Sequence, residues 1–214
     1  MKIAILGATG RTGLVLVRQA LDQGHDVLAL VRNPQAMTKQ IQHERLKAYQ
    51  VDLNDEATIV RPLKEADAVM SCIGAPPSSS FFKSTTLYQD SAVVIVSAMR
   101  QTGLKKLVIM SGSGTKGEQG EMFLARVLRP LLKNLKSMAS MEDYLEQQCA
   151  DINYTVVRPP GLNEKPSTNK EIKSREGQYV PNAALYMPRA DVARFMLSCL
   201  ETDNYDRKMV AISV

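Results

Sequence analysis

Three glycines stand near the start of the chain, each three residues from the next: Gly7, Gly10 and Gly13. They follow an apolar run at residues 1–6 and precede an apolar-periodic segment from Leu14, so the pattern predicts a strand, a tight turn and a helix. In such a turn the first glycine permits the sharp change of direction, the second lets backbone N–H groups approach a diphosphate, and the third lets the helix pack against the strand. The alternative is a glycine-rich turn that binds nothing. The candidate dinucleotide-binding residues of this loop are Gly7, Thr9, Gly10, Arg11, Thr12 and Gly13.

A basic residue stands where this kind of site selects its nucleotide. The next apolar run, residues 26–31, predicts a second strand and is followed by Arg32. Sites that bind NAD usually place Asp or Glu there to bind the ribose 2′-hydroxyl, whereas arginine suits the 2′-phosphate of NADP. Arg11, inside the glycine loop, could reach the same phosphate, unless both arginines are simply solvated surface side chains. NADP(H) is therefore the expected cofactor.

Length and composition fit one globular domain. The 214 residues are 44% hydrophobic and 23% charged, with a net charge of +5. We expect neither a membrane span nor a signal peptide, and no nucleic-acid-binding motif is apparent. The widely spaced Cys72, Cys149 and Cys199 argue against disulfides or a metal centre and predict a cytoplasmic protein. The expected partner is a small molecule, not a nucleic acid or a membrane, and the expected state is a monomer or weak homodimer.

Short strands alternate with helical segments along the chain. Such alternation predicts right-handed βαβ units and a Rossmann-type, doubly wound parallel sheet covered by helices on both faces. No repeat or long linker interrupts it, so residues 1–214 are expected to form a single domain. Ligands of these sheets bind beyond the carboxyl ends of the strands. The expected strands are residues 1–6, 26–31, 46–51, 66–73, 105–110 and 153–158, and one helix is expected over residues 87–101.

The same segments carry a resemblance to a known family. The chain resembles the atypical short-chain dehydrogenases/reductases of the NmrA-like, NAD(P)-binding kind, and most nearly the biliverdin-IXβ reductase/flavin reductase group. The glycine motif is common to the whole superfamily, whereas the C-terminal helix with its Thr-Asp-x-Tyr-Asp tail is more particular to that group. The segments concerned are residues 7–13, 30–32, 51–53, 73–74, 157–160 and 195–206.

The resemblance implies further cofactor contacts. By the resemblance, Asp52 and Leu53, after the third strand, would contact the adenine. Ile73 and Gly74, after the fourth strand, would line the ribose and phosphate. Pro159 and Pro160, after the sixth strand, would flank the nicotinamide. The resemblance also implies an open site in which NADPH reduces flavins or linear tetrapyrroles.

The tyrosine–lysine pair of the larger superfamily is not found. That pair is Tyr-x-x-x-Lys, in which lysine lowers the tyrosine pKa and so supports proton transfer to a carbonyl oxygen. Here Tyr144 is followed four places on by Gln148, and the other tyrosines also lack lysine at that spacing. Alcohol dehydrogenation or sugar epimerisation by this pair is therefore not expected.

Two serines follow the fifth strand and are the candidate catalytic residues, Ser111 and Ser113. The serine of the resembled group would fall on Gly112, so the chain departs from that pattern by one place. A hydroxyl here could complete protonation after hydride transfer to a conjugated ring, or it could merely satisfy the backbone of the turn.

Substrate-site loops are expected at about residues 113–121 and 162–177, which are polar and follow strands. Between them lies a basic amphipathic stretch, residues 126–136, that could attract anionic groups or form a solvated helix face. The expected activity is reduction of a planar conjugated acceptor, a flavin or a bilin such as biliverdin, by NADPH. The alternatives are a non-catalytic, redox-sensing NADP-binding regulator and a quinone or small-carbonyl reductase.

Overall fold

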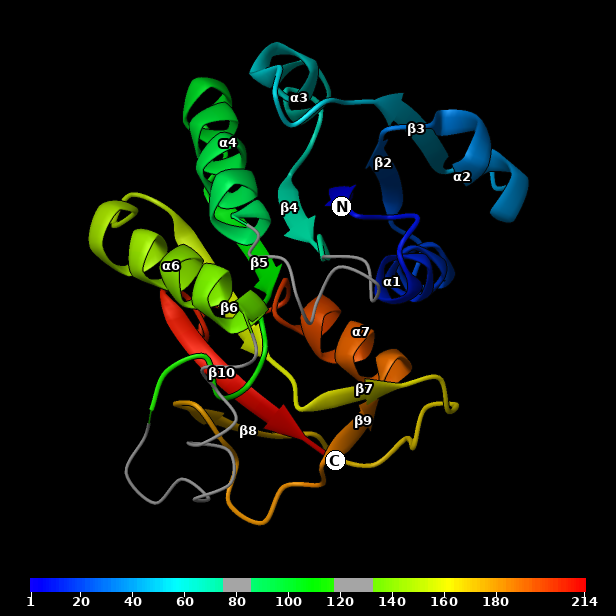
Figure 1. Ribbon diagram of the computed structural model, residues 1–214. Helices are drawn as coiled ribbons and strands as arrows, with labels where there is room; N and C mark the ends of the chain where they lie inside the picture. The colour runs from blue at the N-terminus through cyan, green and yellow to red at the C-terminus, as the bar shows by residue number, and fades with distance from the viewer. Residues whose placement is uncertain (75–85, 118–132) are drawn as a thin grey trace.

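The computed structural model describes residues 1–74, 86–117 and 133–214, and one sheet of eight strands runs through them (Figure 1). In chain order its elements are β1 (Lys2–Leu6), α1 (Arg11–Asp22), β2 (Asp26–Val31), α2 (Pro34–Gln40), β3 (Leu46–Gln50), α3 (Glu56–Leu63), β4 (Ala68–Ser71), α4 (Leu87–Thr102), β5 (Lys106–Met110), α6 (Lys133–Gln148), β6 (Asn153–Arg158), β7 (Gly161–Asn163), β8 (Lys173–Glu176), β9 (Tyr186–Pro188), α7 (Arg189–Ser198) and β10 (Lys208–Ser213).

The strand order is β3-β2-β1-β4-β5-β6-β10-β8, as in a Rossmann-type sheet. Every pairing from β3 through β10 is parallel, and only the edge strand β8 runs antiparallel to its neighbour. After β1, the strands β2 and β3 are added on one side of β1, and β4 is then added on the opposite side of β1. This reversal opens the crevice in which such sheets bind their ligands, at the carboxyl ends of β1 and β4.

Alternating apolar side chains place two cores on the two faces of the sheet. In β1, Ile3 and Ile5 join one core, whereas Ala4 and Leu6 join the other, and all four are buried. The first core lies against α1 and α7, and the second against α3, α4 and α6 (Figure 1). Strands buried on both faces are typical of parallel sheets, so the doubly wound, single-domain fold expected from the sequence is confirmed.

Several boundaries differ from the expected ones. The first helix begins at Arg11, not Leu14, because the last glycine of the motif is already helical. The expected strand over residues 66–73 is shorter, as β4. The strands β7 to β10 were not expected, and β8 lies inside the expected loop 162–177. All four residues of β8 are exposed, so the strand has no apolar pattern and is recognisable only by its pairing with β10.

Within residues 1–74, 86–117 and 133–214, no helix is both long and apolar enough to cross a membrane.

Candidate functional site

The glycine loop joins β1 to α1 at the centre of the sheet, and its three glycines have different surroundings. Gly7 has φ +72°, and a Cβ there would lie 2.7 Å from the backbone of Cys72. A Cβ on Gly13 would lie 2.1 Å from the carbonyl oxygen of Gly7, so the start of the helix packs directly on the loop. Among the described residues, a Cβ on Gly10 would meet only that same oxygen, at 3.1 Å. Two of the glycines are therefore required by packing, and the third leaves the outer side of the loop open.

The first turn of α1 provides the donors that an oxyanion needs. Gly10 is the N-cap and has no side chain to bond the N–H groups of that turn, and the turn contains no acidic residue. The first N–H groups of a helix have no partner inside the helix, and the helix dipole favours negative charge at this end. The loop is therefore compatible with the diphosphate expected from the sequence, and its contacts to a cofactor remain predictions. Thr9 lies within it, and Thr12 is buried in the first turn.

Arg32 directly follows β2, next to the glycine loop because β1 and β2 are parallel neighbours. Its side chain is exposed and bonds no residue in the described part of the chain, whereas Asn33 caps α2. Arg11 is also exposed, and its Nη1 lies 3.4 Å from Oε1 of Glu164. Arg32 is thus at the edge where the adenosine end of a dinucleotide would lie, whereas the Arg11 side chain points toward the segment after β7.

The residues after β3 and β4 line the same edge. Asp52 is exposed, and its Oδ1 accepts hydrogen bonds of 2.9 Å from the backbone and side-chain amides of Asn54, so the carboxylate organises its own turn. Leu53 and Ile73 are half-buried against the second core, and Gly74 is exposed. These positions are compatible with the expected adenine and ribose contacts, which remain predictions.

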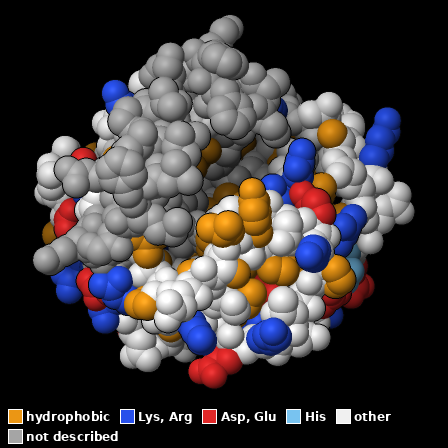
Figure 2. Space-filling model, turned by 60° about the horizontal axis from the view of Figure 1, so that its bottom comes forward, with side chains coloured by type: hydrophobic (Ala, Val, Ile, Leu, Met, Phe, Trp, Pro, Cys, Tyr) orange, Lys and Arg blue, Asp and Glu red, His pale blue; other side chains and the backbone are white. Residues whose placement is uncertain are grey.

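A pocket of about 370 Å³ lies at the carboxyl ends of β5 and β6. These ends face the bottom of Figure 1, and Figure 2 brings that side forward, where hydrophobic side chains gather with arginine and lysine side chains close by. The pocket combines apolar walls with two hydroxyl groups and one guanidinium group. Its lining residues are Ser111, Gly112, Ser113, Leu135, Met138, Pro159, Pro160, Gly161, Leu162 and Arg189.

Both candidate catalytic serines line this pocket, and each hydroxyl donates a hydrogen bond to an acceptor within the protein. Ser111 donates to Oε1 of Glu142 over 2.7 Å, and Ser113 donates to the carbonyl oxygen of Pro159 over 3.0 Å. Each serine oxygen keeps the capacity to accept a hydrogen bond. In this arrangement the serines are acceptors toward the pocket.

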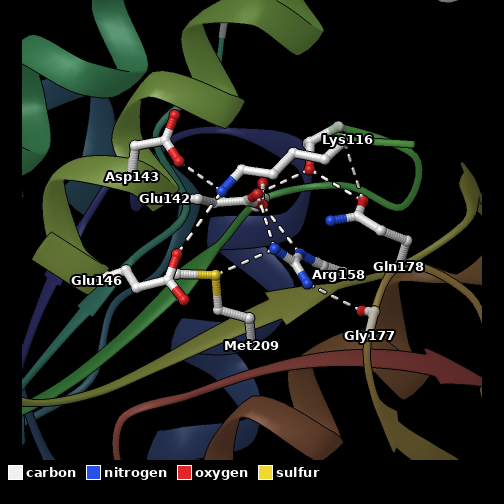
Figure 3. Close-up of polar contacts among 10 residues, drawn as sticks. Lys116, Glu142, Asp143, Glu146, Arg158, Gly177, Gln178 and Met209 are labelled. Atoms are coloured by element: carbon white, nitrogen blue, oxygen red, sulfur yellow. Dashed lines mark hydrogen bonds and ion pairs between the residues drawn. The ribbon is translucent and has the colours of Figure 1, made fainter. Parts of the chain in front are cut away.

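Glu142 is the centre of a buried polar network behind the pocket (Figure 3). The side chain is fully buried on α6, and its carboxylate accepts from Nε of Arg158 at 3.0 Å and from Nη2 at 2.8 Å. Thr115 donates to Oε2 at 2.7 Å, and Nη1 of Arg158 donates to the carbonyl oxygen of Gly177 at 2.9 Å. The network ties α6, β6, the turn after β5 and the end of β8 together, and thereby holds Ser111 in place.

Tyr144 is outside the pocket. It packs against the second core, and burial raises the pKa of its hydroxyl to about 12, with a further contribution from the nearby Cys149. A phenol with such a pKa is a poor acid or base at neutral pH. The structure therefore supplies a second reason, besides the missing lysine, why the tyrosine mechanism is not expected.

Residues that sequence reasoning missed complete the pocket. Leu135 and Met138 come from α6, and Arg189 comes from the first turn of α7. The Arg189 guanidinium also touches the glycine loop: Nη1 donates to the Thr12 hydroxyl over 2.8 Å. No local pattern in the sequence marks Arg189, because α7 lies beside α1 only in the folded chain.

The buried cysteines have no chemical role in this site. Burial raises the pKa of the Cys72 thiol to about 12 and that of Cys199 likewise to about 12, so both stay protonated at neutral pH. They pack in the first core. Among the described residues, His, Cys, Asp and Glu side chains form no cluster of three that could hold a metal ion.

Parts of the expected acceptor site fall outside the described residues. The loop over 113–121 is described only up to Gly117, and the basic stretch over 126–136 only from Lys133. In the described part, Lys136 is exposed on α6. The other loop, 162–177, contributes Leu162 to the pocket wall.

Similar proteins of known sequence cover the whole chain. A photosystem II assembly factor of Synechocystis is 26% identical over 220 residues, which are 97% of this chain and 61% of that protein. The chain spans 51–64% of the length of four curated relatives that it matches.

Solved structures share the fold at low identity. A short-chain dehydrogenase/reductase of Veillonella parvula in complex with NADP has a TM-score of 0.79 at 17% identity, over 100% of this chain and 94% of that one. A candidate NADH-flavin reductase of Streptococcus pneumoniae has a TM-score of 0.77 at 20% identity, over 100% and 99%. At these identities the likeness shows the fold alone.

The glycine loop, the sheet order and these comparisons agree with the resemblance to atypical short-chain dehydrogenases/reductases. The sequence model of the NAD(P)H-binding family matches residues 7–203, and the chain belongs to that family.

Proposed function

We propose that the protein is an NADPH-dependent reductase that transfers hydride to a planar conjugated acceptor, a flavin or a linear tetrapyrrole such as biliverdin. The observation that carries the proposal is the pocket at the ends of β5 and β6, which has apolar walls and adjoins the glycine loop through Arg189. Leu135, Met138, Pro159 and Leu162 provide surfaces suited to a flat ring.

The polar groups of the pocket favour an acceptor that needs no proton from the protein at the moment of reduction. Bound NADPH would supply the hydride, and the chain's own residues would supply position and exclude water. Ser111 and Ser113 already donate their hydroxyl hydrogen bonds to acceptors inside the protein, so toward a ligand they would accept hydrogen bonds from an N–H or O–H group. An extended π-system delocalises the added charge and can take its proton from water.

Preference for NADPH over NADH is supported by Arg32. The residue directly follows β2, where the ribose is expected from the sequence, and it is exposed and unpaired within the described residues. One structural neighbour was solved with NADP, which agrees with this preference.

A second candidate function is an NADP-binding regulator without turnover. The same serine geometry favours it, because no described side chain of the pocket is set to protonate a substrate. Two curated relatives are assembly factors by name. A third reading is a quinone or small-carbonyl reductase.

One assay separates the three. The purified protein is mixed with NADPH, and loss of reduced-nicotinamide absorbance is followed with FMN, riboflavin, biliverdin isomers, quinones and small aldehydes. Turnover of flavins or bilins supports the proposal, and turnover confined to quinones or aldehydes replaces the acceptor class. Tight NADP⁺ binding without any turnover supports the regulator. NADH in place of NADPH, with the Arg32→Ala variant beside Arg18→Ala, tests the cofactor preference in the same experiment.

A further inference from the structure

Arg189 connects the two halves of the site. Its side chain is 16% exposed, lines the acceptor pocket, and reaches the first turn of α1, where Nη1 donates to the Thr12 hydroxyl over 2.8 Å. Its Nε donates to Oε1 of Glu164 over 2.9 Å. Arg189 is thus in contact both with the pocket and with the loop that fits a diphosphate.

The Glu164 carboxylate occupies a place suited to an oxyanion. It accepts from Arg189 and lies 3.4 Å from Arg11, so two guanidinium groups converge on one oxygen. Glu164 itself is 58% exposed and lies just after β7, where it has room to move away. The hydrogen bond from Arg189 lowers the pKa of the Glu164 carboxyl, with the nearby charges acting in the same direction.

The remaining donor of Arg189 is open. Nη2 has no hydrogen-bond partner among residues 1–74, 86–117 and 133–214, whereas Nε and Nη1 are both bonded. A guanidinium binds phosphate best through two donors in one plane, and exchange of Glu164 for a ligand would free Nε beside Nη2.

A dinucleotide must pass this point. With its diphosphate at the glycine loop and its nicotinamide in the pocket, the cofactor would run past the Arg189 side chain, which contacts both places and would face the nicotinamide-side phosphate of that diphosphate. We propose that Arg189 binds the nicotinamide-side phosphate of the cofactor and exchanges Glu164 for it. This inference rests on the proposed function in one respect only, the placement of the nicotinamide in the pocket.

Calorimetric titration without any acceptor tests the proposal. The two ligands are NADP⁺ and adenosine 2′,5′-bisphosphate, which lacks the nicotinamide-side phosphate. Arg189→Gln should weaken NADP⁺ binding about ten-fold, the effect of losing a charge-assisted hydrogen bond, and should leave the bisphosphate within about two-fold. Arg189→Lys should lose less, because the charge remains.

Two further variants control for charge and for exchange. Arg18→Gln removes a positive charge from an exposed position on α1, and should leave both affinities unchanged. Glu164→Gln removes the competing carboxylate, and should leave NADP⁺ binding as tight or tighten it a few-fold. Thermal unfolding of each variant confirms that the comparison is made between folded proteins.

Unchanged NADP⁺ affinity in Arg189→Gln would overturn the inference. An equal loss of affinity for NADP⁺ and for the bisphosphate would also overturn it, because Arg189 would then only stabilise the packing of α7 against α1. Weakened NADP⁺ binding in Glu164→Gln would overturn the exchange. Failure of the proposed function would give a different result. The native protein would reduce no acceptor, while Arg189→Gln would still weaken its NADP⁺ binding.

Discussion

Glu142 on α6 and Arg158 on β6 form a two-point ion pair in the interior, with bonds of 3.0 and 2.8 Å. The same carboxylate accepts a hydrogen bond from the Ser111 hydroxyl at the pocket wall. Structural support for the pocket and the orientation of its Ser111 hydroxyl therefore depend on one buried charge.

The first prediction concerns the stability that this pair provides. Arg158→Met leaves the Glu142 carboxylate buried without its partner, and should lower the free energy of unfolding by about 3–5 kcal/mol. Arg100→Met is the matched control, because Arg100 pairs with Asp151 while both side chains are 40% or more exposed, and it should cost about 1 kcal/mol or less. Urea unfolding measures both. An equal loss of unfolding free energy in the two variants would mean that burial does not determine how much an ion pair contributes to stability.

The second prediction separates two glycines of the cofactor loop. Gly13→Ala pushes a methyl group into the Gly7 carbonyl oxygen, and should cost about 3 kcal/mol or more of stability. Gly10→Ala meets only one atom, at 3.1 Å, and should cost about 1 kcal/mol while weakening NADP⁺ binding, because its methyl group occupies the open side of the loop. Unfolding and calorimetric titration of both variants test this. Undiminished NADP⁺ binding by Gly10→Ala would contradict the assigned role.

The third prediction concerns nucleotide choice. Arg32→Ala should weaken NADPH binding by about ten- to a hundred-fold, since a hydrogen bond to a charged group contributes about 1.5–3 kcal/mol. Binding of NADH, which lacks the phosphate, should hardly change. Titration of the native protein with both cofactors gives the reference, and equal affinities there would refute the preference for NADPH.

The fourth prediction concerns acid stability. Burial disfavours ionisation of Asp191, but hydrogen bonds from Ser167, the Thr168 backbone and Arg194 outweigh it and lower the pKa of this carboxyl. A folded-state pKa below the unfolded value of about 3.9 stabilises the fold above that pH, and the contribution disappears as the pH falls through the folded-state pKa.

Asp191→Asn should therefore cost about 1–3 kcal/mol near neutral pH and progressively less below about pH 4. Urea unfolding of both proteins across this range measures the difference. A difference that stays constant down to the acid transition would show that the charge of Asp191 is not what stabilises α7.

The fifth prediction concerns mechanism. Tyr144→Phe should change turnover of FMN by no more than a few-fold, because Tyr144 is outside the pocket and its pKa is raised to about 12. Steady-state rates with saturating NADPH measure it. A fall of several powers of ten with intact NADPH binding would restore a mechanism based on tyrosine.

The placement of the candidate cofactor residues at the strand ends was predictable from the sequence because these residues are local. Gly7 to Gly13 and Arg32 each follow a strand within a few residues, and the parallel sheet brings strand ends together. Glu142 and Arg189 were not predictable, because each acts across elements that meet only on folding: Glu142 with Ser111, and Arg189 with Thr12. The strand β8 was missed for the same reason, since its four exposed residues are defined by β10 alone.

The arrangement of the site along the chain has a consequence for how such proteins diversify. The glycine loop, Arg32, Asp52 and the end of β4 all lie within the first 74 residues, whereas the pocket lining comes from residues 111 to 189. If the proposed function is correct, nucleotide choice and acceptor choice can therefore change independently, by exchange of one stretch of sequence or by insertions after β7. Arg189 limits such an exchange, because its side chain contacts both the glycine loop and the pocket. A replacement for the second half of the chain must still provide a donor for the Thr12 hydroxyl.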